Sequence, residues 1–572
     1  MESKKKWVYL LVCVVVVLCV AAEYYAIHPA INIHETLFWS IAFILFLLLG
    51  ILTGVRKIRK MAGGKKNKKN LSLKELIKLP KISIVFLGLA AVVVLTVIIG
   101  GICGMTFFNA KRYASLLEVK EYDFSEDMQE STQVTDIALM DTASARKFGN
   151  RKIGSLSDVV SQYEVETDYT QISIEKKPMK VSGLKYASFF KWLNNRKNGI
   201  PGYVKVNPVN SNAEYVSLKK GMRYVPSAYF NDNLERHVQL NYPTKIISGY
   251  HFEIDDEGNP FYICPTVTAK VGLFDGLDVN GVIICDPVGG GCDYYKLGEI
   301  PAWVDCVYDG HLLTKKYDWY GTLSDGFWNS VIGQKGCKVT TDDYGYKIIE
   351  DDVWIYTGVT SVTGDQSNIG FVLINQRTNE AKYYKVSGAE EHSAMDSAEG
   401  AVQEKRYQAS FPSLINVAGK PTYIMVLKDA AGLVKMYAMV NVEQYNIVAT
   451  ATSQTEVFQK YRKMLASNSD GSDVETETQT KEITVSEVRF VDTEDGTMVY
   501  IKDTEHQVYK QAFKENEELI LATAGDTLRV TYEPMENGIH LLSGFEILRR
   551  ADSGEGFSLE EEDNSELKSG AE

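Results

Sequence analysis

Five cysteines in the middle of the 572-residue chain are the side chains with the clearest potential chemistry. They are Cys264, Cys285, Cys292, Cys306 and Cys337. An odd number leaves at least one thiol free or paired with another chain. No CxxC motif or Cys/His cluster occurs, and the eight histidines are scattered, so the sequence predicts no metal site.

Acidic and polar clusters are the other candidates for chemistry. The runs EIDDEG (253–258), TTDDYG (340–345) and IEDDVW (349–354) lack the spacing of a calcium loop, and each lies where a turn is expected. We therefore predict solvated turn residues. The loop TGDQSNIG (363–370) gathers Asp365, Gln366, Ser367 and Asn368 and is predicted to be an Asx-rich loop that deserves inspection as a polar site.

Motifs of common enzyme classes do not occur. The sequence has no Gly-x-Ser-x-Gly nucleophile turn, no P-loop and no dinucleotide-binding glycine pattern. We therefore predict no catalytic residue and no cofactor.

A repeated pattern shows which elements carry these residues. Residues 202–218 (GYVKVNPVNSNAEYVSL), 281–297 (GVIICDPVGGGCDYYKL) and 370–386 (GFVLINQRTNEAKYYKV) align without a gap. Each begins with Gly, alternates through apolar residues, has Asn or Asp at the sixth place and Tyr at the fourteenth. This pattern predicts a β-hairpin, in which the Asn or Asp side chain bonds the backbone of the turn. Because an isolated hairpin is marginally stable, each copy must pair with further strands or pack on helices.

Two cysteines occupy matching places in the second copy. Cys285 and Cys292 correspond to Val206 and Ala213 in the first copy. These places flank the turn, so the two Cβ atoms are expected to be cross-strand neighbours at ~5 Å. We predict a Cys285–Cys292 disulfide, and a pair of buried thiols is the alternative.

A helix is expected before a more divergent hairpin, because SAMDSAEGAVQEKRY (393–407) precedes PTYIMVLKD (421–429). This order, together with GFVLINQRTNEAKYYKV, resembles the PepSY-type module, a small helix-plus-hairpin fold of exported bacterial proteins. The chain as a whole is similar to a largely uncharacterised family of multi-pass cell-envelope membrane proteins of Gram-positive bacteria. The resemblance implies an exported binding or peptidase-regulating role and carries over no catalytic residue.

Three apolar runs near the N-terminus predict a membrane anchor. They begin at Trp7, Thr36 and Ile82, and a bilayer core requires about 20 apolar residues in a helix. Lys and Arg precede the first run and fill the segment 56–81 between the second and third. Cytoplasmic loops retain such cations, so the N-terminus is expected in the cytoplasm and everything after about residue 108 outside it. A cleaved signal peptide in place of the first span is the alternative.

Charge is divided between these regions. Residues 1–104 contain 14 Lys and Arg against four Glu, although the whole chain has a net charge of −13. The basic segment suits an anionic lipid bilayer surface. The acidic exterior speaks against nucleic acid as a partner, because phosphate binding requires cations.

We therefore predict an α-helical anchor of three spans (1–110), followed by an α+β exterior. The exterior comprises a membrane-proximal α/β region or stalk (111–181), PepSY-like hairpin repeats (182–463), a flexible linker (464–482), a small OB-like or SH3-like β-barrel (483–550) and an acidic disordered tail (551–572).

The expected function is non-catalytic binding or scaffolding of envelope proteins or wall polymer. Two alternatives stay open: an envelope hydrolase or peptidase acting on a wall or peptide substrate, and an accessory subunit of a transport or secretion complex. Few polar groups in the apolar runs speak against a conduction path. The residues do not indicate the ligand or the oligomeric state.

Overall fold

The computed structural model describes residues 2–62, 80–131, 134, 137–362, 367–468, 479–493, 496–513, 516–534 and 538–551. The chain forms two compact units, Met1–Met464 and Leu465–Glu572. The predicted linker is covered only by the end of a helix and the start of a strand, and the predicted tail only by Ala551, so both predictions lie mostly outside the described residues.

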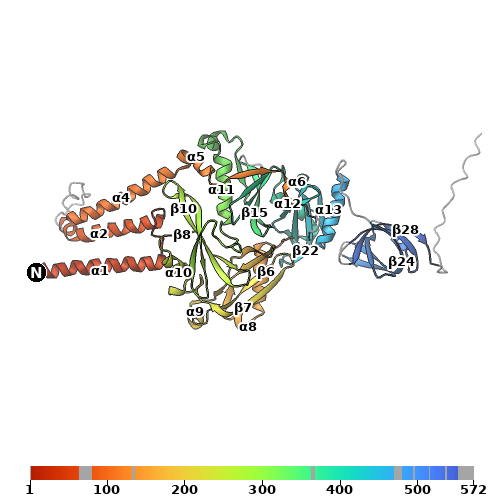
Figure 1. Ribbon diagram of the computed structural model, residues 1–572, viewed down its shortest axis with the longest axis horizontal. Helices are drawn as coiled ribbons and strands as arrows, with labels where there is room; N and C mark the ends of the chain where they lie inside the picture. Colours follow the sequence, from red (N-terminus) through yellow and green to blue (C-terminus); the bar gives the residue numbers. More distant parts are fainter. Residues whose placement is uncertain are drawn as a thin grey trace, which may run out of the picture. The chain divides into compact units, whose positions relative to one another are not determined.

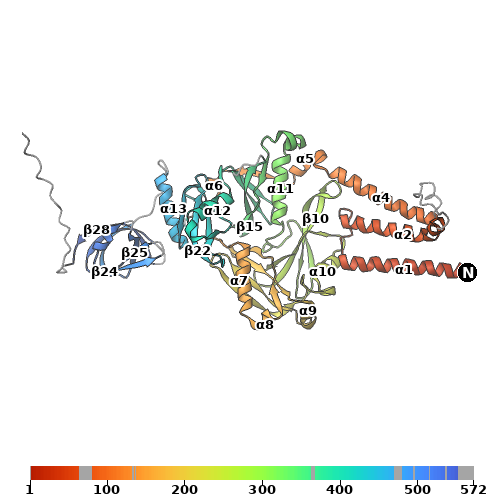
Figure 2. The ribbon, with the colours of Figure 1, turned by 180° about the vertical axis from the view of Figure 1, so that it is seen from behind.

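Long N-terminal helices extend from one end of the first unit (Figures 1 and 2). They are α1 (Glu2–Ile27), α2 (Thr36–Ala62) and α4 (Lys81–Gly104). Two stretches, Thr36–Gly54 and Lys81–Gly104, are long and apolar enough to cross a membrane, and most of their residues are not buried. The apolar part of α1, Val14–Ile27, is shorter, so three spans remain a prediction.

Small residues bring α2 and α4 together. A Cβ on Gly50 would lie 2.8 Å from the Leu87 side chain, and Ser83 Oγ donates to the Gly50 carbonyl at 2.5 Å. Close approach at small residues is the usual way in which helices associate in lipid.

The three aligned segments each form an antiparallel hairpin, as predicted. The pairs are β6 (Ile200–Asn207) with β7 (Asn212–Met222), β11 (Asp275–Cys285) with β12 (Cys292–Lys296), and β16 (Ser367–Asn375) with β17 (Ala381–Tyr384). The sixth-place residues also do what was expected of them. Asn207, Asp286 and Asn375 each accept a bond through Oδ1 from the backbone N–H two residues ahead, at 2.8–2.9 Å.

A glycine–tyrosine contact explains why the first and fourteenth places keep the same spacing in all three copies. A Cβ added to Gly202, Gly281 or Gly370 would lie 2.4–2.6 Å from the ring or hydroxyl of the fourteenth-place tyrosine. The tyrosines are Tyr215, Tyr294 and Tyr383. The ring covers the space above the glycine, so a side chain at the first place would displace it.

A fourth hairpin has the same register without the glycine. It joins β21 (Lys420–Lys428) to β22 (Val434–Asn441). Val426 faces Tyr437 there, as Val204 faces Tyr215 in the first hairpin. Asp429 bonds the turn backbone through Oδ1, which accepts from Ala431 N at 3.0 Å. Ile424 stands where the other copies have glycine.

Each hairpin belongs to a different sheet of the first unit. The first sheet has the order β3-β4-β6-β7, with β3 Thr170–Ile174 and β4 Lys177–Ser182. The second has the order β12-β11-β10-β8, with β10 Pro260–Val271, β8 Ile246–Ile247 and β9 (His251–Ile254) beside β10. The third sheet has the order β1-β17-β16-β15-β13, in which β1 is Val119–Tyr122, β15 is Asp352–Ser361 and β13 is Lys338–Thr340. Two further strands belong to it: β14 (Gly345–Ile349) pairs with β15, and β18 (Gly388–Ala389) pairs with β16. The fourth has the order β19-β21-β22-β23, with β19 Gln408–Ala409, β23 Val448–Ala451 and β20 (Ser413–Val417) beside β21.

Helices precede the sheets in the chain, which gives an α+β arrangement. They are α7 (Thr142–Gly154), α10 (Leu234–Asn241), α11 (Gly310–Leu323) and α12 (Glu391–Gly400), and α13 (Gln454–Asn468) follows the fourth sheet. Neighbouring sheets share apolar cores: the first with the second, the second with the third, and the third with the fourth. Shorter elements complete the unit: α5 (Thr106–Ala114), α6 (Phe124–Asp127), α8 (Ser157–Val160), β2 (Tyr163–Val165), β5 (Leu184–Tyr186) and α9 (Phe189–Asn195).

Strands from residues 111–181, for which the sequence predicts a membrane-proximal α/β region or stalk, pair with strands from later in the chain. The strand β1 lies parallel to β17 in the third sheet, and β3 and β4 belong to the first. Short strands need partners to be stable in water, and these strands find them in sheets built mainly from later residues.

The second unit contains β24 (Gln479–Thr493), β25 (Gly496–Asp503), β26 (Val508–Ala512), β27 (Thr527–Glu533) and β28 (Ile539–Arg549). The strands pair in the order β24-β25-β26-β28-β27, and β24 also pairs with β27. A short 3₁₀ helix, Glu517–Leu521, lies between β26 and β27 in the chain.

A buried carboxyl group makes the stability of the first unit depend on pH. Glu391 is 1% exposed, accepts from Gly358 N at 2.6 Å, and is bonded by Thr341 Oγ1 at 3.1 Å. Burial raises its pKa to about 7 from an ordinary 4.5. The folded state therefore binds the proton more tightly than the unfolded state. This contribution to stability is present below pH 4.5 and is lost as the pH rises to about 7.

We expect Glu391→Gln to flatten this dependence, because the amide keeps the shape and is neutral at every pH. The full-length protein in detergent should lose on the order of 2–3 kcal/mol of stability through this group between pH 4.5 and 7.5, and the variant should not. Thermal unfolding across that range is the measurement, and the exposed Glu404→Gln is the control. Equal slopes for wild type and Glu391→Gln would contradict the assignment.

Candidate functional site

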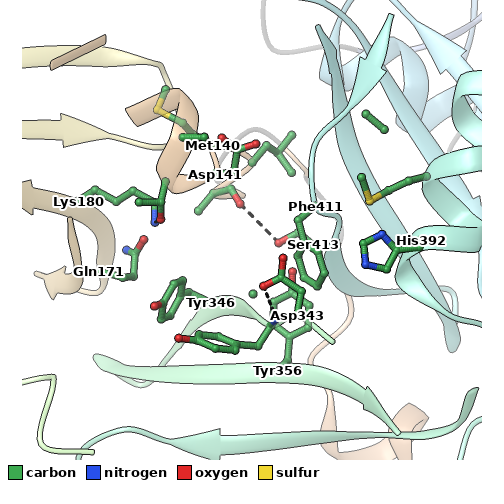
Figure 3. A pocket seen from close by; sticks show the side chains of 18 residues that line it. Met140, Asp141, Gln171, Lys180, Asp343, Tyr346, Tyr356, His392, Phe411 and Ser413 are labelled. Carbon is green, nitrogen blue, oxygen red and sulfur yellow. Dashed lines mark hydrogen bonds between the residues drawn. The ribbon is translucent and has the colours of Figure 1, made fainter. Parts of the chain in front are cut away.

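A cavity of about 410 Å³ lies where the first, third and fourth sheets meet (Figure 3). We call it the lysine cavity. Lys180 and Gln171 lie on one wall, and Phe411, Ser413 and His392 lie across from them. The remaining lining is Ala138, Leu139, Met140, Asp141, Thr142, Ala143, Asp343, Tyr344, Gly345, Tyr346, Tyr356, Met395 and Ala409. A concave space with a few polar groups among apolar ones is the usual form of a ligand site.

Lys180 is the most unusual residue of this cavity. It is on β4 and only 3% exposed, yet no carboxylate lies within ion-pair distance of it among the described residues. Its Nζ donates to Thr142 Oγ1 at 3.2 Å and lies 5.0 Å from the centre of the Tyr346 ring. Burial lowers its pKa from 10.5 to about 8, although Asp141 acts in the opposite direction. The amine is thus largely cationic at neutral pH with little local compensation.

The nearest acid is committed to another cation. Asp141 caps the N-terminus of α7, where its side chain accepts from Ser144 N at 2.7 Å. It also forms an ion pair of 2.6 Å with Lys428 at the end of β21. This network ties the first sheet's helix to the fourth sheet. It leaves Lys180 able to bind an anionic group that enters the cavity.

A second lysine, Lys347, is half-buried and lines a neighbouring cavity. A smaller cavity of about 180 Å³ shares Ala138, Gln171, Tyr346 and Ser413 with the lysine cavity. Lys347 lines it and donates to the Leu414 carbonyl at 3.0 Å. Burial lowers the pKa of Lys347 to about 8.

Gln171 and Tyr346 also line a larger cavity of about 460 Å³, which we call the acidic cavity. Its titratable lining includes Glu166, Asp168, Glu235, Asp309, His251 and Tyr262. Oε1 of Glu166 and the hydroxyl of Tyr262 are both buried, and neither has a hydrogen-bond partner in the described part of the chain. Burial raises the pKa of Glu166 and lowers that of His251. Unpaired buried polar atoms of this kind are costly unless a ligand or water meets them.

The acidic runs predicted to be solvated turns take three different roles. Asp255 bonds its own turn, as predicted, accepting from Asn259 N at 2.7 Å. Asp343 lines the lysine cavity instead. Asp351 accepts from Ser173 Oγ at 2.7 Å and joins the third sheet to the first, while Asp352 forms an ion pair with Arg377. The prediction of a solvated turn residue is right for Asp351, which is exposed, whereas Asp352 is half-buried beside Arg377.

The polar loop does not contribute to either cavity among its described residues. Asp365 and Gln366 lie outside the described part of the chain. Ser367 and Asn368 begin β16, and buried Asn368 donates to the Ala389 carbonyl and to the Tyr423 hydroxyl, each at 3.3 Å. Its role is to join the third sheet to the fourth.

The predicted thiol pair is located as the hairpin alignment requires. Cys285 and Cys292 face each other across β11 and β12, and their sulfurs lie 2.7 Å apart. Both are free thiols in this structure, and the disulfide between them stays a prediction.

Sequence reasoning missed Lys180, Gln171 and His392. None belongs to a motif, and a lysine in a strand is usually exposed. The one available signal is that side chains alternate between the two faces of a strand, which places Lys180 on the same face of β4 as Ser182. That the face is buried depends on a sheet formed by residues far away in the sequence.

Replacing the buried amine should stabilise the protein. We expect Lys180→Met to raise stability at pH 7 by on the order of 1–3 kcal/mol, because the apolar chain avoids burying a charge. The depressed pKa also predicts that wild-type stability rises between pH 8 and 10.5, where the amine becomes neutral, and that the variant loses this rise.

Lys316→Met is the matched contrast. Lys316 is fully buried but paired with Asp278 at 2.7 Å. Its loss should cost about 3–5 kcal/mol, because Asp278 is left without its partner. Chemical denaturation of the full-length protein in detergent compares the two, and destabilisation by both substitutions would refute the unpaired state of Lys180.

Comparisons with known proteins identify no relative on which a function can be based. No family model matches the chain, and no curated protein matches it. Among solved structures, the chain is similar to a crystal structure of an ACO/RPE65 chimera at 7% identity and a TM-score of 0.12. The match covers 65% of this chain and 59% of that one, and it carries no argument about fold or function.

Proposed function

We propose that this chain is a membrane-anchored extracytoplasmic binding protein of the bacterial cell envelope, without catalysis of its own. The observation that carries the proposal is Lys180, a buried cation that faces a cavity of about 410 Å³ and has no carboxylate partner among the residues that the structure describes. Proteins retain such destabilising groups mainly where a ligand uses them.

The proposed anchor has three spans, with the N-terminus and residues 56–81 in the cytoplasm. Two apolar helices with exposed apolar side chains support it, since such surfaces are stable in lipid and not in water. The cations of residues 56–81 and the Lys run at residues 4–6 support the orientation.

The anchor is attached to the exterior unit by polar contacts to backbone carbonyls of that unit and by close packing. Ile31 N donates to the Pro243 carbonyl at 2.7 Å, and His34 Nδ1 lies 2.7 Å from the Leu273 carbonyl oxygen. The turn between β10 and β11 packs on the end of α4, where a Cβ on Gly272 would lie 2.7 Å from the Gly104 Cα. These contacts support an exterior unit held at a fixed position above the bilayer.

The ligand we propose is a peptide or a peptide-bearing wall polymer. A carboxylate would bind at Lys180, and an ammonium group would suit Glu166 and Asp168 in the acidic cavity. The two cavities share Gln171 and Tyr346, so one extended ligand with both charges can contact both.

The second unit is proposed to be an OB-like barrel, and the hairpin sheets to be PepSY-like modules. The pairing of β24 with both β25 and β27, and the parallel pairing of β26 with β28, favour the OB-like alternative over the SH3-like one. Such a barrel supports binding as a general role and selects no ligand by itself.

Orientation is tested on intact cells with a membrane-impermeant amine reagent. Exposed Lys177 and Lys197 should be labelled in intact cells, because they lie on the proposed exterior. Lys66 and Lys68 should be labelled only after lysis. The reverse pattern, read by mass spectrometry of tryptic peptides, would place the folded unit in the cytoplasm and end the proposal.

Binding is tested by calorimetry on the full-length protein in detergent, with muramyl peptides released from purified cell wall as the probe. Lys180→Met should weaken binding roughly tenfold or more, because a charge-assisted hydrogen bond is lost. Lys177→Met, on the same strand but exposed, should bind as wild type does.

The stability of the variant and the fate of the probe distinguish a loss of binding from unfolding and from catalysis. Lys180→Met is expected to be more stable than wild type, so weaker binding cannot be attributed to unfolding. Equal affinity of wild type and Lys180→Met would refute the site. Cleavage of the probe by the wild-type protein would favour the envelope hydrolase instead.

A further inference from the structure

A histidine lies beside the cysteine pair of the second hairpin. His237 comes from α10, Cys285 from the end of β11 and Cys292 from the start of β12. One ligand-type atom of each lies within 4.8 Å of those of the other two. The Nε2 atom of His237 lies 2.7 Å from the Gly290 carbonyl, which can only accept, so Nε2 carries a proton.

The two sulfurs differ in access and in electrostatics. Cys285 is fully buried, whereas Cys292 is half-buried. The contact with the Cys285 sulfur lowers the pKa of Cys292 to about 6, and His237 acts in the same direction. The same contact, followed by burial, raises the pKa of Cys285. A half-buried cysteine with a lowered pKa beside a fully buried one is an arrangement suited to thiol–disulfide exchange.

The geometry favours sulfur chemistry over metal binding. The sulfurs are 2.7 Å apart, and a bond between them needs ~2.05 Å. Two thiolates on one zinc ion, each at ~2.3 Å, would lie roughly 3.8 Å apart in a tetrahedral site. Closing the pair to a disulfide therefore takes a smaller movement than opening it around a metal ion.

We propose that Cys285 and Cys292 form a thiol–disulfide exchange site, with Cys292 as the attacking sulfur, Cys285 as the resolving sulfur and His237 as a positioning residue. The substrate class is a disulfide or dithiol of another exported protein. None of these three residues lines the lysine cavity. The exchange site therefore does not depend on the proposed binding function.

The reaction balances without a further reagent. The Cys292 thiolate attacks one sulfur of the substrate disulfide and releases the other as a thiolate. Cys285 then gives its proton, through water, to the released substrate thiolate and attacks Cys292, which releases the second substrate sulfur as a thiolate that takes a proton from water. The pair is oxidised by two electrons and the substrate reduced by two. The reverse sequence transfers the disulfide from the pair to a substrate dithiol.

Trapping experiments use the full-length protein in detergent with oxidised glutathione as the probe. Both cysteines fall in one tryptic peptide, residues 271–296, which holds no other cysteine. Cys285→Ser should retain one glutathione on this peptide, because the resolving sulfur is absent. Cys292→Ser should retain at least tenfold less, and the wild type should form the internal disulfide.

The pH profile of alkylation tests the role of His237. The titratable groups around the pair include His237, Asp232, Tyr242, Tyr250, Tyr262, Cys264, Asp286 and Asp293. Iodoacetamide should modify Cys292 of the reduced wild type with a midpoint near pH 6, and His237→Gln should move that midpoint upwards by roughly one pH unit. Tyr242→Phe is the control: it removes a hydroxyl that donates to the Cys292 carbonyl at 2.9 Å and should leave the midpoint unchanged.

Three results would overturn the proposal. Equal glutathione retention by the two serine variants would remove the division of roles. Absence of glutathione on folded Cys285→Ser, with folding checked by thermal unfolding, would show that Cys292 does not exchange. One equivalent of bound zinc or copper in the purified wild type, with thiols that react only after chelation, would make the cluster a metal site.

Discussion

The packing of a tyrosine ring over a glycine in the facing strand is the constraint on which the first unit depends. It recurs as Tyr215 on Gly202, Tyr294 on Gly281 and Tyr383 on Gly370. A glycine in a strand is weak by itself, since it adds no side chain to pack and has much conformational freedom to lose. The ring restores the lost contact area. It also fixes the register, because sliding the hairpin by one residue would place the ring on the opposite face.

The fourth hairpin tests this explanation within the same molecule. Tyr437 faces Val426 in the shared register, yet Ile424 replaces the glycine. Ile424 is fully buried, and on the opposite face of β21 its neighbour Tyr423 packs edge to face on Phe371 at 5.8 Å, so both faces of this strand are covered. The register can therefore be kept by a shared core as well as by a glycine–tyrosine contact. The latter is the form that three of the copies use.

The local features of this fold could be predicted from the sequence, and the assembly could not. Hairpin positions and the turn bonds of Asn207, Asp286 and Asn375 follow from spacing and from short-range hydrogen bonding. The position of β1 against β17 does not, because the two are joined across some 260 residues and nothing local marks them as partners. The same limit applies to Lys180. Its burial results from the meeting of three sheets, whereas the cysteine pair was predictable because both sulfurs lie within one hairpin.

Chemistry in this unit lies beside the turns, at places that the glycine–tyrosine contact leaves free. The fifth place of the hairpin holds Val206, Cys285 and Ile374 in the three aligned copies, and its cross-strand partners are Ala213, Cys292 and Ala381. Apolar pairs fill two copies, and thiols fill one. Lys180 lies next to the same place of the first copy, since it pairs with Val206. In the fourth copy the fifth place is Lys428, which binds Asp141 at the edge of the lysine cavity. A repeated hairpin of this kind keeps its register through one pair of places and varies its chemistry through another, so neighbouring copies can share a fold and perform different tasks.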